Sequence, residues 1–168
     1  MGHPRQGGRV KAFRRSRHQF VAVFEPVEAE TLSLLANQLA ELVGSRADHD
    51  SDPALARLLP DAYPDDVEAS AEFRRFTADD LASRKSANAR RIVADLATAA
   101  RASSPTAVKV DAQSAQAWVR SLTDIRLTIA ARLGIEADGD LGSEDPVLLD
   151  LYDWLGFVQG SLVDCLDH

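Results

Sequence analysis

The stretch that most constrains this fold is residues 112–134, AQSAQAWVRSLTDIRLTIAARLG, the longest regular helical pattern in the chain. At about 3.6 residues per turn, apolar side chains recur on one face from Trp118 through Leu122 to Leu133, and further apolar residues cover much of the remaining surface. Only a narrow polar stripe is left, and it includes Asp124. A helix that is apolar nearly all round is buried, so we expect the other elements to pack about it.

The remaining elements are shorter and follow ordinary start and stop signals. Strands are predicted over residues 10–15, 19–24 and 107–110, with a hairpin turn near residues 16–18 and basic side chains marking a solvated edge. Helices are predicted over residues 26–44, 53–59, 66–76 and 77–101 and from residue 146 to near the end of the chain. Thr77, with Asp80 three residues on, fits a capping box, and Phe76 is expected to face inward. The predicted fold is α+β, mainly α, a helical bundle around a central buried helix with a small two- or three-stranded antiparallel sheet.

Length and composition favour one domain in a reducing compartment. With 168 residues, of which 45% are hydrophobic, the chain can bury a core without metal or disulfide support. We expect a disordered basic start over residues 1–9 and a single helical domain with an N-terminal hairpin over residues 10–168. A single cysteine, Cys165, excludes an internal disulfide. No apolar run approaches the length of a membrane span, so we expect a cytoplasmic protein without membrane association.

The net charge of −7 is unevenly distributed, because residues 1–18 contain several cations and no acid. Such an arm is a candidate nucleic-acid contact, although it can equally be a solvated end that offsets the acidic body. The candidate nucleic-acid-binding residues are Arg9, Lys11, Arg14, Arg15 and Arg17. A second basic concentration, over residues 74–91, contains acids at helical spacing, which favours a solvated, ion-paired face or a face for a protein partner.

A set of polar residues falls where the helical period predicts apolar ones. Lys85 and Asn88 lie on the apolar face of one predicted helix, and Arg126 lies on that of the central helix, near Asp124. A buried cation needs a carboxylate or carbonyl partner, so this set is either a lock that fixes helix register or a site for a small anion. Catalytic motifs, cofactor loops and metal-ligand spacings are not found in the sequence, and we expect neither an enzyme nor a cofactor. The carboxylates of residues 48–52 fix no coordination geometry in a polar loop.

The last predicted helix offers a candidate interface. Gly156 and Gly160 leave a flat strip where a second backbone can approach, and Phe157 points away from the main apolar face. The strip serves either a homodimer or packing inside the monomer. Cys165 lies near the C-terminal end of this helix, where the dipole raises the pKa of a thiol, so we do not expect a nucleophile or a peroxide sensor.

Three stretches together carry a family resemblance: residues 52–96, residues 110–135 (VDAQSAQAWVRSLTDIRLTIAARLGI) and residues 152–166 (YDWLGFVQGSLVDCL). They resemble an actinobacterial domain-of-unknown-function family that includes the oxidative-stress regulator AosR. The resemblance implies a small cytosolic regulator that acts in transcription of redox-stress genes through a sigma factor. The redox behaviour of that branch depends on a CxxxC cysteine pair, whereas here Ser161 precedes Cys165.

Three functions follow as hypotheses. The first is a non-enzymatic regulatory protein that binds a protein partner, by resemblance a sigma factor or the transcription machinery, through the last helix or the basic face of residues 74–91. The second is a nucleic-acid-binding protein that uses the basic arm. The third is a small anion-binding domain at Lys85, Asn88 and Arg126.

Overall fold

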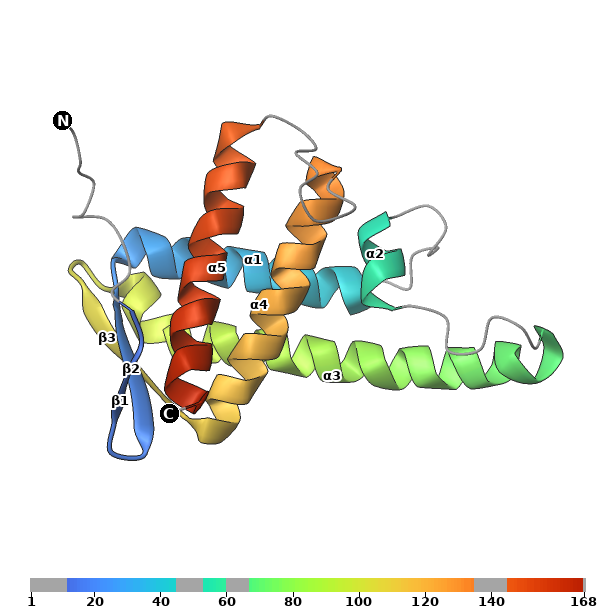
Figure 1. Ribbon diagram of the computed structural model, residues 1–168, viewed down its shortest axis with the longest axis horizontal. Helices are drawn as coiled ribbons and strands as arrows, with labels where there is room; N and C mark the ends of the chain where they lie inside the picture. The colour runs from blue at the N-terminus through green and yellow to red at the C-terminus, as the bar shows by residue number, and fades with distance from the viewer. Residues whose placement is uncertain (1–11, 45–52, 60–66, 135–144, 168) are drawn as a thin grey trace.

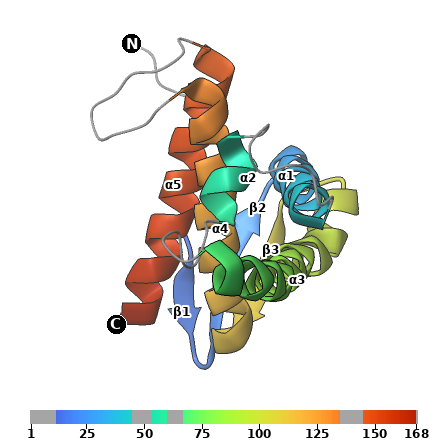
Figure 2. The ribbon, with the colours of Figure 1, turned by 90° about the vertical axis from the view of Figure 1, so that its right-hand side faces the viewer.

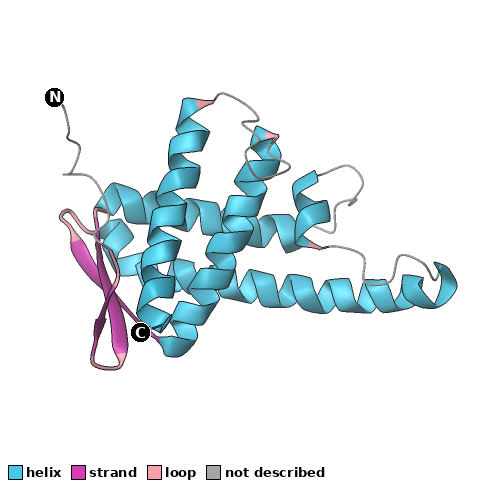
Figure 3. Cartoon of the chain, in the orientation of Figure 1, coloured by secondary structure: helices cyan, strands magenta, loops and turns pink. Residues whose placement is uncertain are grey.

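The computed structural model describes residues 12–44, 53–59, 67–134 and 145–167. Five helices and a three-stranded antiparallel sheet make up this part of the chain, which confirms the α+β, mainly α class (Figure 3). In chain order the elements are β1 (Arg14–Ser16), β2 (Gln19–Phe24), α1 (Pro26–Gly44), α2 (Pro53–Leu58), α3 (Val67–Arg101), β3 (Thr106–Asp111), α4 (Ala112–Leu133) and α5 (Pro146–Asp167). The predicted disordered start lies outside the described residues.

Helix α4 is the central buried helix that the sequence predicts. It packs against all four other helices and against β2 and β3 (Figure 1). The Asp111 carboxylate caps its N-terminus by accepting a hydrogen bond from the Ser114 backbone N–H at 2.8 Å. At the other end Gly134 adopts a left-handed conformation with φ of 79°, which a residue without a side chain adopts at no steric cost.

The sheet has the strand order β1-β2-β3, with both pairs antiparallel. Gln19 pairs with Asp111 and Phe24 with Thr106, so β2 lies in the middle and β1 forms an edge. All three residues of β1 are exposed, as expected of a basic edge strand that resists further pairing. Residues 10 and 11 of the predicted first strand lie outside the described residues, and within the described part the ladder pairing of this strand begins at Arg14.

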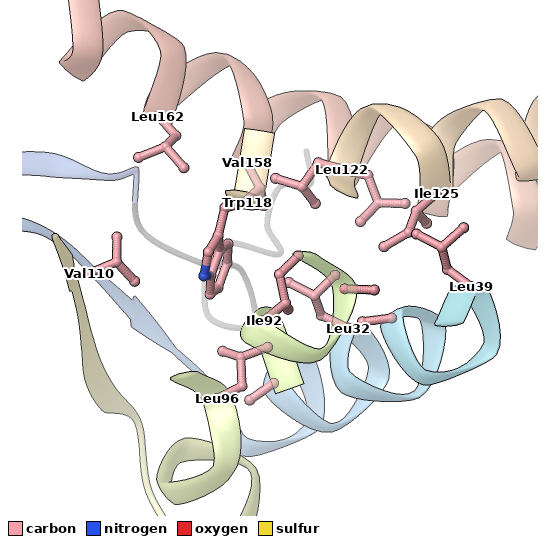
Figure 4. Close-up of a cluster of buried hydrophobic side chains, with 14 of the residues drawn as sticks. Leu32, Leu39, Ile92, Leu96, Val110, Trp118, Leu122, Ile125, Val158 and Leu162 are labelled. Atoms are coloured by element: carbon pink, nitrogen blue, oxygen red, sulfur yellow. The ribbon is translucent and has the colours of Figure 1, made fainter. Parts of the chain in front are cut away.

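An aromatic cluster joins this sheet to the helices. The Trp118 ring is fully buried, with its centroid 5.6 Å from that of Phe13 and 6.1 Å from that of Phe24. Figure 4 shows the indole among Val110 of β3 and Ile92 of α3. Its Nε1–H donates a hydrogen bond of 2.8 Å to the carboxylate of Asp95 on α3, so the largest apolar side chain of the core also carries a satisfied polar group.

The helices form two crossed layers. Helix α1 packs along α3, while α4 and α5 lie side by side and cross that pair steeply, as the two views in Figures 1 and 2 show. Helix α5 packs chiefly on α4, and its far end lies against β1. The sheet closes one end of this arrangement.

One prediction about the helices is wrong. Residues 66–76 and 77–101 were expected to form two helices, but α3 is continuous over Val67–Arg101. The hydroxyl of Thr77 can cap a helix only where the backbone departs from helical geometry, and neither glycine nor proline stands nearby to cause that departure. The N-terminal part of α3 extends beyond the other helices (Figure 1), and Phe76, predicted to face inward, is 75% exposed.

The Trp118 hydrogen bond predicts an asymmetry between the two tryptophans. Trp118→Phe removes the indole N–H that donates to Asp95, and so leaves this carboxylate without its hydrogen-bond donor. We expect the substitution to lower the free energy of unfolding by about 1–3 kcal/mol. Trp154→Phe is the matched control, because the Trp154 indole N–H has no acceptor among the described residues. Urea denaturation measures both variants, and equal losses would contradict the assignment.

Candidate protein-interaction site

Lys85 and Asp124 form an ion pair between α3 and α4. The Lys85 Nζ lies 2.8 Å from the Asp124 Oδ1, and the two side chains are 19% and 6% exposed. The expectation that Lys85 finds a carboxylate is therefore confirmed. Burial raises the pKa of Asp124 and the Lys85 hydrogen bond opposes that rise. The pair engages both charges inside the monomer, as a register lock does.

Arg126 lies on the opposite side of α4 from Asp124, because side chains two residues apart in a helix point in directions about 200° apart. Its guanidinium stacks on the Tyr152 ring, with the Cζ atom 4.3 Å from the centroid, and Nη1 donates a 3.4 Å hydrogen bond to the Gln159 Oε1. Its Nε is buried without an acceptor among the described residues. Asn88 is half-buried on α3. The structure thus does not bring Lys85, Asn88 and Arg126 together as one anion site.

A second polar network joins α3 to α4, and the sequence did not reveal it. The Arg91 Nε of α3 donates to the Ser114 Oγ of α4 at 2.9 Å, and Asp95 of α3 accepts from Trp118 of α4. Burial raises the pKa of Asp95, while its hydrogen bond from Trp118 and the nearby Arg91 charge lower it. Helical spacing gave the faces of these residues but not their partners on the other helix.

Two side chains in the C-terminal half of α5 form hydrogen bonds with the backbone of Phe13, which precedes β1. The Phe13 backbone N–H donates to the Ser161 Oγ at 3.1 Å, and the Cys165 thiol donates to the Phe13 carbonyl at 3.1 Å. The pKa of Cys165 is raised by burial and then by the neighbouring Asp164 charge, whereas Arg15 lowers it. The direction agrees with the expected one, but its causes are burial and Asp164 rather than the helix dipole. These two side chains, four residues apart, thus hydrogen-bond the backbone N–H and C=O of one residue.

A side chain of the same chain, that of Arg126, occupies part of the proposed glycine strip. A Cβ atom at Gly156 would lie 3.1 Å from the Arg126 Nη2, so this glycine makes room for the guanidinium. Gly160 is exposed, with nothing within 4 Å of a Cβ built there. Phe157 is 49% exposed, in agreement with its predicted direction.

The candidate nucleic-acid residues lie only partly in the described chain. Arg14, Arg15 and Arg17 are exposed on β1 and its turn, and the Arg15 Cζ lies 5.8 Å from the Phe20 ring centroid. Arg9 and Lys11 lie outside the described residues, as do residues 48–52. Within the described ranges, no group of three metal-ligating side chains occurs.

An open groove that the sequence did not predict lies along α1. Two adjoining hollows of about 560 and 550 Å³ share Leu151 of α5 and extend over α1 from Val27 to Leu42. The N-terminal half of α5 walls both hollows, and Ile125 and Ile129 of α4 line the second. The only sequence signal for this groove was the outward direction of Phe157.

Apolar side chains are left uncovered around the first of these hollows. Val27 is 65% exposed, Val147 72% and Phe157 49%, and all three line it together with Trp154. Exposed apolar side chains that gather on one surface mark an interaction site more often than scattered ones do. The groove is therefore the candidate site of this protein, and its chemistry is that of a docking surface.

The Lys85–Asp124 pair predicts a pH-dependent loss on substitution. Because burial raises the pKa of Asp124, its contribution to stability is fully present below its unfolded pKa of about 3.9 and is lost as pH rises through the higher folded pKa. Lys85→Met raises the folded pKa further, and we expect the free energy of unfolding near neutral pH to fall by about 1–3 kcal/mol. Urea denaturation as a function of pH should show this loss shrinking toward pH 3.

The double variant Lys85→Met/Asp124→Leu is the control, because it removes both charges and should recover most of the stability near neutral pH. A single variant as stable as the native protein at every pH would contradict the role of this pair as a lock.

The two glycines of α5 predict different responses to alanine. Gly160→Ala meets no atom and should raise the free energy of unfolding by about 0.5–1 kcal/mol through the helix preference of alanine. Gly156→Ala should stabilise less or destabilise, because its Cβ meets Arg126. Thermal denaturation measures both, and a change of oligomeric state in Gly160→Ala would instead indicate a dimer through the strip.

Among the described helices, none has the length and apolar character that crossing a membrane requires. The chain matches no curated protein and no solved structure. The model of the family described as "Domain of unknown function (DUF2017)" matches residues 10–166, the described elements and the groove included. The chain therefore belongs to this domain-of-unknown-function family.

Proposed function

We propose that this protein is a non-enzymatic regulatory protein that acts by binding another protein. The observation that carries the proposal is the gathering of Val27, Val147 and Phe157 around one groove, where each is about half exposed or more. Large apolar side chains held in water on one face favour association, because a partner removes their surface from solvent.

Several interior polar groups have partners inside the fold, and this supports the same function. Lys85, Asp124 and Asp95 have partners within the monomer, so their charges fix helices against each other. The Cys165 thiol donates to a backbone carbonyl and has a raised pKa, which keeps it in its less reactive protonated form. Within the described residues, the feature that other molecules can contact is therefore the apolar groove rather than a cluster of reactive side chains.

The resemblance to the AosR-containing actinobacterial family gives the proposal its finer form. We place this protein in the cytoplasm as an AosR-like regulator of transcription or oxidative-stress response, with a sigma factor as partner. Its regulation works without an intramolecular thiol switch, because Ser161 occupies the other position of the CxxxC spacing. Ser161 and Cys165 instead hydrogen-bond the backbone N–H and C=O of Phe13.

Phe157→Ser tests the proposed function. Surface plasmon resonance with purified actinobacterial sigma factors and RNA polymerase should detect binding to the native protein, and the variant should bind at least about tenfold more weakly. Phe76→Ser is the matched control, because Phe76 is also exposed but lies on α3, outside the groove, and it should bind as the native protein does.

Failure of every tested partner to bind would overturn the sigma-factor assignment. Equal effects of the two substitutions would overturn the groove as the binding surface. Circular dichroism verifies that both variants retain the helical fold.

A further inference from the structure

The groove along α1 has a definite charge. Helices α1 and α5 contain Glu28, Glu30, Glu41, Asp150, Asp153, Asp164 and Asp167, and neither helix contains a lysine, an arginine or a histidine. Asp150 and Asp153 line the first hollow beside its exposed apolar side chains. At the other end Glu41 lies with Arg132 of α4, so the negative charge is concentrated toward Val27.

The groove also has the dimensions of a helix. The part of α1 that it follows, from Val27 to Leu42, is about 22 Å long at 1.5 Å per residue, which corresponds to about four helical turns. Leu35 and Ile129 contribute to the apolar floor of the groove, and acidic side chains form its rim. An amphipathic helix places apolar anchors at i, i+3, i+4 and i+7 into such a groove.

We propose that this groove binds a basic amphipathic helix of a partner protein. The inference rests on the proposed function and names the chemistry of its partner: leucine-like anchors on one face, flanked by lysine or arginine. Opposite charges on the rim select this partner and speed its approach, whereas nucleic acid and acidic segments are repelled.

Trp154 adds a second, independent feature. Its indole lines the hollow, and its Nε1 is buried without an acceptor among the described residues. Turning this ring toward an acceptor on a docked helix would therefore gain a hydrogen bond and break none. Trp154 is also a spectroscopic reporter for the groove, because the other tryptophan, Trp118, is fully buried in the core.

The test is a fluorescence titration with a designed 15-residue peptide, which carries leucines at i, i+3, i+4 and i+7 spacing and lysines elsewhere. We expect saturable binding that shifts the tryptophan emission, weakens with added salt, and loses its signal in Trp154→Phe. A second peptide with glutamate in place of each lysine should bind at least about tenfold more weakly. Equal affinity for the two peptides would overturn the proposal.

A pair of charge reversals locates the binding. Asp150→Lys/Asp153→Lys should weaken binding of the lysine peptide at least about tenfold. The matched control Asp164→Lys/Asp167→Lys changes the same helix and the same net charge outside the groove and should bind within about twofold of the native protein. Asp150→Asn/Asp153→Asn should give an intermediate loss, which verifies the effect without added charge. Equal losses in the two reversed variants would indicate general attraction and overturn the proposal.

Two further outcomes separate this inference from the proposed function. If Phe157→Ser abolishes binding of a protein partner while the lysine peptide does not bind, the docking function stands and the basic-helix inference fails. If sedimentation shows a native dimer that Asp150→Lys/Asp153→Lys dissociates, the occupant is a second copy of this chain, and the inference fails likewise.

Discussion

The hydrogen bond from the Trp118 indole to Asp95 is the interaction on which the rest of the structure depends. An indole placed at the junction of sheet, α3 and α4 buries a large apolar area, but its N–H must find an acceptor there. Asp95 can supply that acceptor only at one rotation and one translation of α3 against α4. The position of β2 and the Phe13 segment then follows, because their rings pack on the same indole.

The other interior polar groups also fix neighbouring helices against α4, each at a different place along it. Asp124 faces α3 and accepts from Lys85, while Arg126 faces α5, where Tyr152 and Gly156 receive its guanidinium. Replacing such groups with apolar ones is often tolerated energetically, so their main effect is to exclude alternative helix registers. A helix that is apolar nearly all round has little else to fix its rotation.

Sequence reasoning succeeded where the signal is local. Pro26, Asp111 and Gly134 mark helix ends by backbone chemistry that acts within a few residues, and the elements they bound were predicted closely. The division of α3 at Thr77 failed because a capping residue is compatible with a helix interior as well as with a start. The cation at Lys85 was expected to find a carboxylate, but the ring under Arg126 and the acceptor of Trp118 depend on which helices meet, and periodicity does not give that.

The groove arises from the same layer geometry that buries α4. Because α4 and α5 cross α1 steeply, only part of each helix meets the other layer, and the N-terminal half of α5 extends past α1 (Figures 1 and 2). Leu155, Val158 and Leu162 are buried, whereas Leu148, Leu151 and Trp154 are covered only in part. The apolar face of α5 is thus longer than the surface that this chain provides to cover it. Acidic side chains around such a face oppose self-association by mutual repulsion. They are also the reason why we propose a segment of opposite charge as its partner.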